Sequence, residues 1–187
     1  MSCSTTNFQK SFMFDNMFAG TRLQQSCDGE HVYLFFFGKT SFLSNFASSP
    51  MSIDGTSFSC AEQAFQYFKA KFFNEDEIAK QILEMDNPSE MAITGQHVFI
   101  LHKPKQSEWN DVAVDTMEQI LRAKFSQNEE LKSLLKRTSP CMLVESNPYD
   151  RVFGNGLGIG NAKSDCHHNW PGQNVMGKIL ENIRSKL

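Results

Sequence analysis

Hydrophobic and polar positions follow a strand-like spacing early in the chain and a helical spacing over most of the remainder. Val32–Phe37 is a short apolar run that ends at Gly38, and such a run predicts a buried strand. Residues 51–58 contain the pair Asp54-Gly55, which is typical of a tight turn, so a small hairpin is expected there.

Apolar residues recur at helical intervals in the segments that follow. This spacing predicts helices over residues 60–73, 75–85, 109–125 and 128–136, and a last helix that Asn174 caps. A few strands followed mostly by helices predict a mainly α fold of the α+β class.

Proline and glycine mark the interruptions of the helical pattern. Residues 88–94 follow an Asn-Pro break and predict a short helix that Gly95 ends. Met142–Val144 is expected to be a short strand. Residues 147–173, with two prolines and five glycines, predict a loop.

Composition and charge narrow the class of protein. The chain has 187 residues, about one domain, and its 17 phenylalanines beside 3 tyrosines and 2 tryptophans predict a phenylalanine-rich core. A formal charge of −3 argues against a protein that binds nucleic acid through bulk electrostatics. A small basic pocket for a phosphate group stays compatible with that charge.

The N-terminal stretch differs in composition from the rest. Residues 1–28 are rich in Ser, Thr, Asn and Gln, which predicts a flexible tail, although its phenylalanines could instead anchor it to the domain or to a partner. Residues 29–187 show no further boundary and are expected to form one domain. The chain has neither an apolar run long enough to span a bilayer nor a signal peptide, so no membrane association and a cytoplasmic location are expected, with the nucleus as the alternative.

The cysteines are odd in number, scattered and without a CxxC pair, which predicts free thiols in a reducing compartment. They are Cys3, Cys27, Cys60, Cys141 and Cys166. The run Cys166-His167-His168 does not predict a metal site, because adjacent residues seldom supply several ligands to one ion.

The helix predicted over 60–73 carries the most informative polar residues. Glu62, Gln66 and Lys69 fall at positions i, i+4 and i+7 of one face, beside a stripe of phenylalanines, and could frame a polar pocket. The alternative is structural: Ser59 and Glu62 match a capping box, in which the glutamate only satisfies backbone N–H groups at the helix start.

Other candidate residues have two interpretations each. Asn45 and Phe46 follow the first strand and could form a turn or hold a ribose or a base. Trp109 could belong to the core or stack on a base. Asp150 could be a turn residue, and the glycine-rich loop 154–160 could be mobile surface or approach a phosphate.

The order of these motifs is more specific than any one of them, and the series resembles the YbiA-like, or NADAR, family from about residue 33 to the C-terminus. The motifs that carry the resemblance are Leu43-Ser44-Asn45-Phe46, the Asp54-Gly55 turn, Ala61-Glu62-Gln63-Ala64-Phe65-Gln66 with Lys69-Ala70, Trp109, Ala123-Lys124-Phe125, Leu143-Val144-Glu145, Asp150-Arg151-Val152-Phe153-Gly154 and Gly172-Gln173-Asn174-Val175-Met176-Gly177.

The resemblance implies a compact, largely helical domain with a few short strands and an N-glycosidase that needs no metal or cofactor. Implied substrates carry a ribosyl C–N bond, either in ribose phosphates such as early riboflavin-pathway intermediates or in ADP-ribosylated small molecules and nucleic-acid bases. A non-catalytic module that binds ADP-ribose or a nucleotide is the alternative, and an interaction protein that uses the tail is a third hypothesis. The oligomeric state stays open.

By position in the family pattern, Glu62 and Asp150 are the implied catalytic acids. The implied substrate-binding residues are Asn45, Phe46, Lys69, Trp109, Arg151, Phe153, Gly154 and Asn174. Three departures from the family pattern stand out: Gln96 where an arginine is frequent, Phe153 where a tryptophan is frequent, and Gln63 where a histidine is usual. The first removes a possible phosphate-binding guanidinium.

Overall fold

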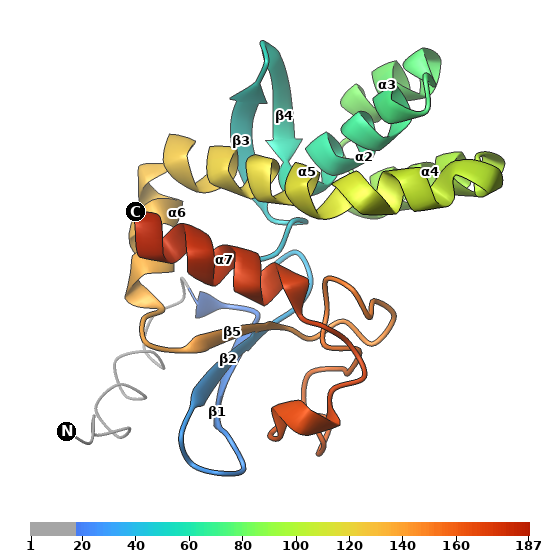
Figure 1. Cartoon of the computed structure of the whole chain (residues 1–187). Coiled ribbons are helices and arrows are strands. Elements are labelled where there is room, and N and C mark those ends of the chain that lie inside the picture. The colour runs from blue at the N-terminus through green and yellow to red at the C-terminus, as the bar shows by residue number, and fades with distance from the viewer. Residues whose placement is uncertain (1–17) are drawn as a thin grey trace. The chain divides into compact units, whose positions relative to one another are not determined.

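The computed structural model describes residues 18–187, so most of the predicted tail and Cys3 lie outside the described residues. The chain forms two compact units (Figure 1). Residues up to Ser44 together with Ser133–Leu187 form one, here called the sheet unit, and Asn45–Lys132 form the other, here called the helical unit. Helices and short strands confirm the α+β class.

The sheet unit is built on three short strands in the order β1-β2-β5. Strand β1 (Thr21–Gln25) is antiparallel to β2 (Val32–Phe36), and β2 is parallel to β5 (Met142–Glu145). The apolar run of β2 is almost fully buried, as a strand between two neighbours requires. Helix α7 (Val175–Lys186) packs along β5 in the same unit (Figure 1).

The helical unit begins with a hairpin of β3 (Ser48–Ile53) and β4 (Thr56–Cys60). Its turn residues Asp54 and Gly55 have φ angles of 49° and 81°, as the sequence predicts for a tight hairpin with positive φ at both positions. This turn lets β4 lead directly into the first long helix of the unit.

Four helices complete the helical unit: α2 (Ala61–Phe72), α3 (Asp76–Leu83), α4 (Pro88–Leu101) and α5 (Gln106–Gln127), with a 3-10 turn at Lys103–Lys105. Helix α2 is central, because it contacts α3, α4 and α5 (Figure 1). Helix α6 (Glu129–Arg137) follows α5 and continues into the sheet unit. Among residues 18–187, no helix combines the length and the apolar character needed to cross a membrane.

Two expected boundaries differ from the structure. Strand β1 lies inside the stretch 1–28 that was expected to be a flexible tail, because its backbone pairs along the whole of β2. Helix α4 runs past Gly95 to Leu101, so Gly95 does not end it. The glycine is needed there for close packing, since a Cβ at Gly95 would overlap the side chain of Gln66.

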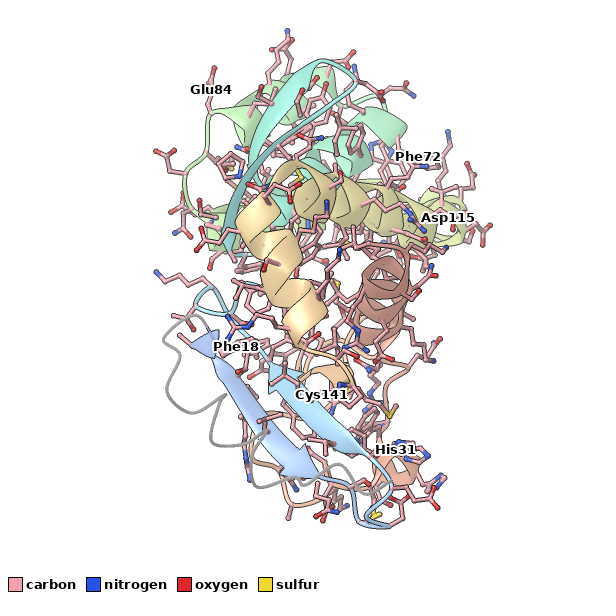
Figure 2. The ribbon with its side chains drawn as sticks, turned by 90° about the vertical axis from the view of Figure 1, so that its left-hand side faces the viewer. Phe18, His31, Phe72, Glu84, Asp115 and Cys141 are labelled. Atoms are coloured by element: carbon pink, nitrogen blue, oxygen red, sulfur yellow. A yellow bond between two sulfur atoms is a disulfide. The ribbon has the colours of Figure 1, made fainter. Side chains whose placement is uncertain are left out.

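The cysteine prediction is wrong for one pair. Cys27 and Cys166 form a disulfide within the sheet unit, with Cα atoms 5.2 Å apart, although 139 residues separate them in sequence. The backbone N–H of Cys27 also donates to the carbonyl of Asp165, so the two segments already run side by side. Among the described residues Cys60 and Cys141 are free and buried, and Cys141 is labelled in Figure 2.

Candidate active site

The start of helix α2 shows which residue caps it. Cys60 is the N-cap, and its Sγ accepts from the backbone N–H of Gln63 at 3.5 Å. The side-chain Oε1 of Gln63 reaches back and accepts from the backbone N–H of Ser59 at 2.8 Å. The predicted capping box of Ser59 with Glu62 is therefore wrong, because Gln63 takes the capping position one residue later.

Gln63 also fixes the end of helix α3. Its Nε2 donates to the carbonyls of Ile82, Leu83 and Met85, at 2.9, 3.2 and 3.1 Å. These carbonyls belong to the last turn of α3 and the residues after it, where acceptors have no partner within the helix. Gln63 thus has a structural role in this chain.

Glu62 is left to form a row of hydrogen-bonded polar side chains, here called the polar row: Asn45, Glu62, Gln66 and Lys69. Glu62 is 4% exposed. Asn45 Nδ2 donates to one carboxylate oxygen at 2.6 Å, and Gln66 Nε2 donates to the other at 2.7 Å. Lys69 Nζ donates to Gln66 Oε1 at 2.8 Å. The i, i+4, i+7 prediction of one polar face is confirmed.

Backbone contacts hold the polar row as well. The N–H of Glu62 donates to the carbonyl of Asn45 at 2.9 Å, so the loop after β2 and the first turn of α2 are joined twice. Phe46 follows Asn45 in this loop and is half-buried. Asn45 therefore acts as a clamp on Glu62 rather than as a simple turn residue.

Lys69 lies in an aromatic environment. Its Nζ is 5.3 Å from the ring centre of Phe65, 5.7 Å from that of Phe99 and 5.9 Å from that of Trp109. Burial lowers the pKa of Lys69 to about 8, and the charge of Glu62 partly opposes this shift. The lysine is thus mostly protonated at neutral pH but loses its charge under mildly basic conditions.

Helix α4 contributes Gly95, which was predicted to end a helix but lies inside this one. A Cβ built on Gly95 would lie 1.7 Å from Gln66 Oε1, so only glycine lets α4 approach the polar row this closely. Gln96, the next residue, is exposed on α4. Gly95 and Phe99 are the members of the site that were missing from the predicted residues.

Trp109 is 3% exposed, so the prediction of a core tryptophan is confirmed. Its ring centre lies 5.3 Å from that of Phe65 and 5.5 Å from that of Phe72. Because it also lies over Lys69, it forms an apolar wall beside the polar row. The core position and a position at the candidate site are compatible for this residue.

A second lysine of the helical unit is fully buried. Burial lowers the pKa of Lys124 to about 7, and the nearby Cys60 thiol partly opposes the shift. Burial raises the pKa of Cys60, which disfavours the nucleophilic thiolate form. In the sequence, Lys124 stands out only as part of the motif Ala123-Lys124-Phe125.

The remaining predicted residues lie in the sheet unit, in the loop between β5 and α7. Asp150 Oδ1 accepts from the backbone N–H groups of Val152 and Phe153, at 2.8 and 2.9 Å. The turn interpretation of Asp150 is therefore observed. Arg151 is exposed, and its carbonyl accepts from the N–H of Gln173.

Two residues shape the way this loop enters α7. Asn174 has a left-handed φ of 51°, and its amide joins the strand β5 instead of capping the helix: Nδ2 donates to Leu143 O at 2.8 Å, and Oδ1 accepts from the N–H of Glu145 at 3.0 Å. The carbonyl of Gly154 accepts from the N–H of Asn174 at 3.0 Å. The predicted side-chain cap at Asn174 is thus wrong, although the residue occupies the N-cap position.

The structure therefore brings Asn45, Glu62, Lys69 and Trp109 into one cluster of the helical unit. It places Asp150, Arg151, Phe153, Gly154 and Asn174 in one loop region of the sheet unit. Within residues 18–187, no group of three or more His, Cys, Asp or Glu side chains is placed to hold a metal ion.

The fold and the polar row define an α+β protein with a buried carboxylate that two side-chain amides hold in place. Residues 31–187 match the NADAR domain, and the chain belongs to this family. It is 30% identical to the protein irg-1 of Caenorhabditis elegans over 181 residues, which covers 89% of this chain and 85% of irg-1.

Two further similarities concern one bacterial protein. The N-glycosidase YbiA of Escherichia coli K12 is 33% identical over 144 residues, covering 77% of this chain and 79% of YbiA. The NMR structure of E. coli YbiA is similar with a TM-score of 0.65 and 26% identity, covering 91% of this chain and 90% of YbiA. The predicted family membership and fold are confirmed.

Proposed function

We propose that the chain is an N-glycosidase that hydrolyses a ribosyl C–N bond without a metal, with Glu62 as its catalytic carboxylate. The observation that carries the proposal is the buried Glu62 side chain, whose two oxygens each accept a hydrogen bond from a side-chain amide, at 2.6 and 2.7 Å. The N-glycosidase name of a relative of similar length supports it.

The chemistry fits a carboxylate held in this way. As the C–N bond breaks, its electron pair leaves with the nitrogen and positive charge develops at the anomeric carbon of the ribose. A buried carboxylate stabilises that charge more strongly than an exposed one, because little water screens it. The amides of Asn45 and Gln66 fix its orientation before the substrate arrives, which removes a reorganisation cost.

A water molecule completes the reaction. Its oxygen bonds to the anomeric carbon, one of its protons passes to a base, and the departing nitrogen gains a proton. Glycosidases divide such proton transfers between two carboxyl groups. Glu62 is the proposed group for charge stabilisation and water activation, and Asp150 stays the proposed second acid on the basis of the family pattern.

The substrate class is the finer part of the proposal. An ADP-ribosylated molecule and a ribose phosphate both carry the ribosyl C–N bond and negative phosphate groups. Lys69, protonated at neutral pH and beside Glu62 in the polar row, is the proposed cation for the anionic part of such a substrate. A phosphate contact of this kind would raise the pKa of Lys69.

The test is a hydrolysis panel with purified protein. It contains an ADP-ribosylated guanine, a nicotinamide nucleotide and a ribosylamine phosphate of the riboflavin type, and chromatography follows release of the base or amine. We expect one class to be hydrolysed, and Glu62→Gln to lower that rate by about 10²–10⁴-fold. The matched control is Glu84→Gln, which changes an exposed glutamate of the same unit (Figure 2).

Two results would overturn the proposal. If no class releases a product while calorimetry shows saturable binding of ADP-ribose, the chain is a binding module. If hydrolysis occurs but Glu62→Gln and Glu84→Gln retain equal rates, Glu62 is not catalytic.

A cytoplasmic location belongs to the same proposal, and the Cys27–Cys166 pair gives a way to test it. Disulfides persist mainly in oxidising compartments. The two cysteines lie close enough to form the disulfide once the protein meets an oxidant, and in a reducing compartment we expect protein trapped with an alkylating reagent during cell lysis to carry both as thiols. Recovery of the disulfide form under these conditions would contradict a reducing compartment.

A further inference from the structure

A cavity of about 350 Å³ opens in the helical unit between the hairpin turn, helix α2 and helix α5. Three aromatic residues, Phe68, Phe72 and Trp109, form one part of its lining. Phe72 is 38% exposed, which is unusual for a phenylalanine, and Figure 2 shows its side chain on the surface of this unit. This cavity is here called the ring pocket.

The size of the ring pocket limits what it can hold. Pockets for small ligands range from about 300 to 1,000 Å³, so this one lies at the lower end and suits a single ring system rather than a whole dinucleotide. Its aromatic part favours a flat ligand, since nucleobases of any sequence stack on such side chains.

The charges around the ring pocket argue against a phosphate as the occupant. Lys71 lines it but is bonded to Asp76, and Asp54 contributes a negative group at the hairpin turn. A phosphate would meet a neutralised lysine and a repelling carboxylate. A neutral ring avoids both costs.

Two polar side chains of α5 could recognise the edge of such a ring. Gln119 is exposed and carries an amide that both donates and accepts. The Thr116 hydroxyl already donates to the carbonyl of Val112 at 2.8 Å, so its oxygen is suited to accept from a ligand. A donor and acceptor pattern beside stacked rings is the usual way in which bases are bound.

Trp109 connects the ring pocket to the polar row. The residue lines the pocket, and its ring centre lies 5.9 Å from Lys69 Nζ. We infer that the ring pocket binds a neutral nucleobase of the substrate, with Trp109 as the wall shared by the base and the polar row. The inference rests on the proposed function, because the base is a part of the same substrate.

The two tryptophans of the chain allow a test that does not depend on turnover. The indole N–H signals of Trp109 and Trp170 can be followed by NMR in the Glu62→Gln protein, with assignment by Trp170→Phe. Trp170 belongs to the sheet unit and serves as the internal control. We expect adenosine or guanosine to shift the Trp109 signal with saturation and to leave the Trp170 signal unchanged.

Two matched variants locate the bound base. Val112→Glu places a carboxylate in the lining of the pocket, and Asn110→Glu adds the same charge at an exposed position of the same helix outside it. We expect Val112→Glu to raise the Kd of the nucleoside at least tenfold and Asn110→Glu to leave it within twofold. If Val112→Glu does not fold, Gln119→Ala at an exposed position of the lining replaces it. We expect Gln119→Ala to raise the Kd of the nucleoside at least threefold.

The outcomes separate this inference from the proposed function. A saturable Trp109 shift without any hydrolysis by the parent protein overturns the proposed function and retains the pocket. Hydrolysis without a Trp109 shift, or equal Kd values in the pocket variant and in Asn110→Glu, overturns the pocket and retains the proposed function.

Discussion

The two groups of candidate residues differ in where their side chains direct their hydrogen bonds. In the helical unit, Asn45, Glu62, Gln66 and Lys69 bond mainly to one another. In the sheet unit, Asp150 and Asn174 bond to nearby backbone groups. A row of side chains that hold one another orients reactive groups, whereas side chains bonded to the backbone fix a loop.

This difference separates roles that the family pattern assigns together. Cys60 and Gln63 cap helix α2, and the buried Glu62 carboxylate is held by the side-chain amides of Asn45 and Gln66. Asp150 and Asn174 have structural explanations that suffice by themselves. Variants can therefore be chosen that remove the chemistry of a side chain and keep its structural bonds.

Asp150→Asn gives the largest expected effect outside Glu62. Asparagine retains the oxygen that accepts from Val152 and Phe153, so the turn should persist. If Asp150 is the second acid, hydrolysis falls about 10²-fold at an unchanged unfolding temperature. A hydrolysis rate equal to that of the parent would leave Asp150 with the turn role alone.

Gly95→Ala tests whether the polar row must keep its geometry. The added methyl group would meet Gln66 Oε1 and displace the amide that links Glu62 to Lys69. We expect a loss of about 10–100-fold in kcat/KM, since small displacements at reacting groups have effects of this size. Gly158→Ala is the control, because nothing lies within 4 Å of a Cβ there, and it should be neutral.

Asn174→Ala tests the supporting role in the sheet unit. The variant loses two hydrogen bonds to β5 and places alanine at a φ of 51°. We expect the free energy of unfolding, measured with denaturant, to fall by about 2–4 kcal/mol. Asn174→Gly removes the strain of the positive φ but does not restore the lost hydrogen bonds. Its free energy of unfolding should therefore lie between those of the parent and of Asn174→Ala. Equal stability of all three proteins would contradict the role.

Lys69→Met tests the charge at the end of the polar row. Because the pKa of Lys69 is about 8, hydrolysis that needs its charge should decline as pH rises through 8, by about tenfold at pH 9. The methionine variant should lack this decline and be slower at pH 7. A parent rate that stays constant from pH 7 to 9 would show that the ammonium is not required.

Lys69 also makes the free energy of unfolding depend on pH. The folded-state pKa of about 8 lies below the usual 10.5, so the unfolded chain binds more protons between these values. The free energy of unfolding therefore rises with pH from about 8 to 10.5 through this group. Lys69→Met should remove that part of the slope, as denaturant titrations at several pH values can show.

Local features of the fold could be predicted from the sequence. The Asp54-Gly55 turn, the strand at Val32 and the common face of Glu62, Gln66 and Lys69 follow from short-range patterns, and all three are observed.

Features that depend on contacts between distant residues could not be predicted in this way. Asn45 meets Glu62 across 17 residues, and Cys27 meets Cys166 across 139. Gly95 had a plausible local role as a helix end, but its packing against Gln66 decides its use. The capping of α2 moved by one residue because a cysteine thiol can serve as the N-cap.

The most direct test of Glu62 isolates the chemical step. The substrate found in the hydrolysis panel is mixed with excess Glu62→Gln protein, and the single-turnover rate is compared with that of the parent, because this rate is independent of product release. We expect a rate about 10²–10⁴-fold lower, with substrate affinity changed by no more than a few-fold. A single-turnover rate within threefold of the parent would contradict the central role of Glu62.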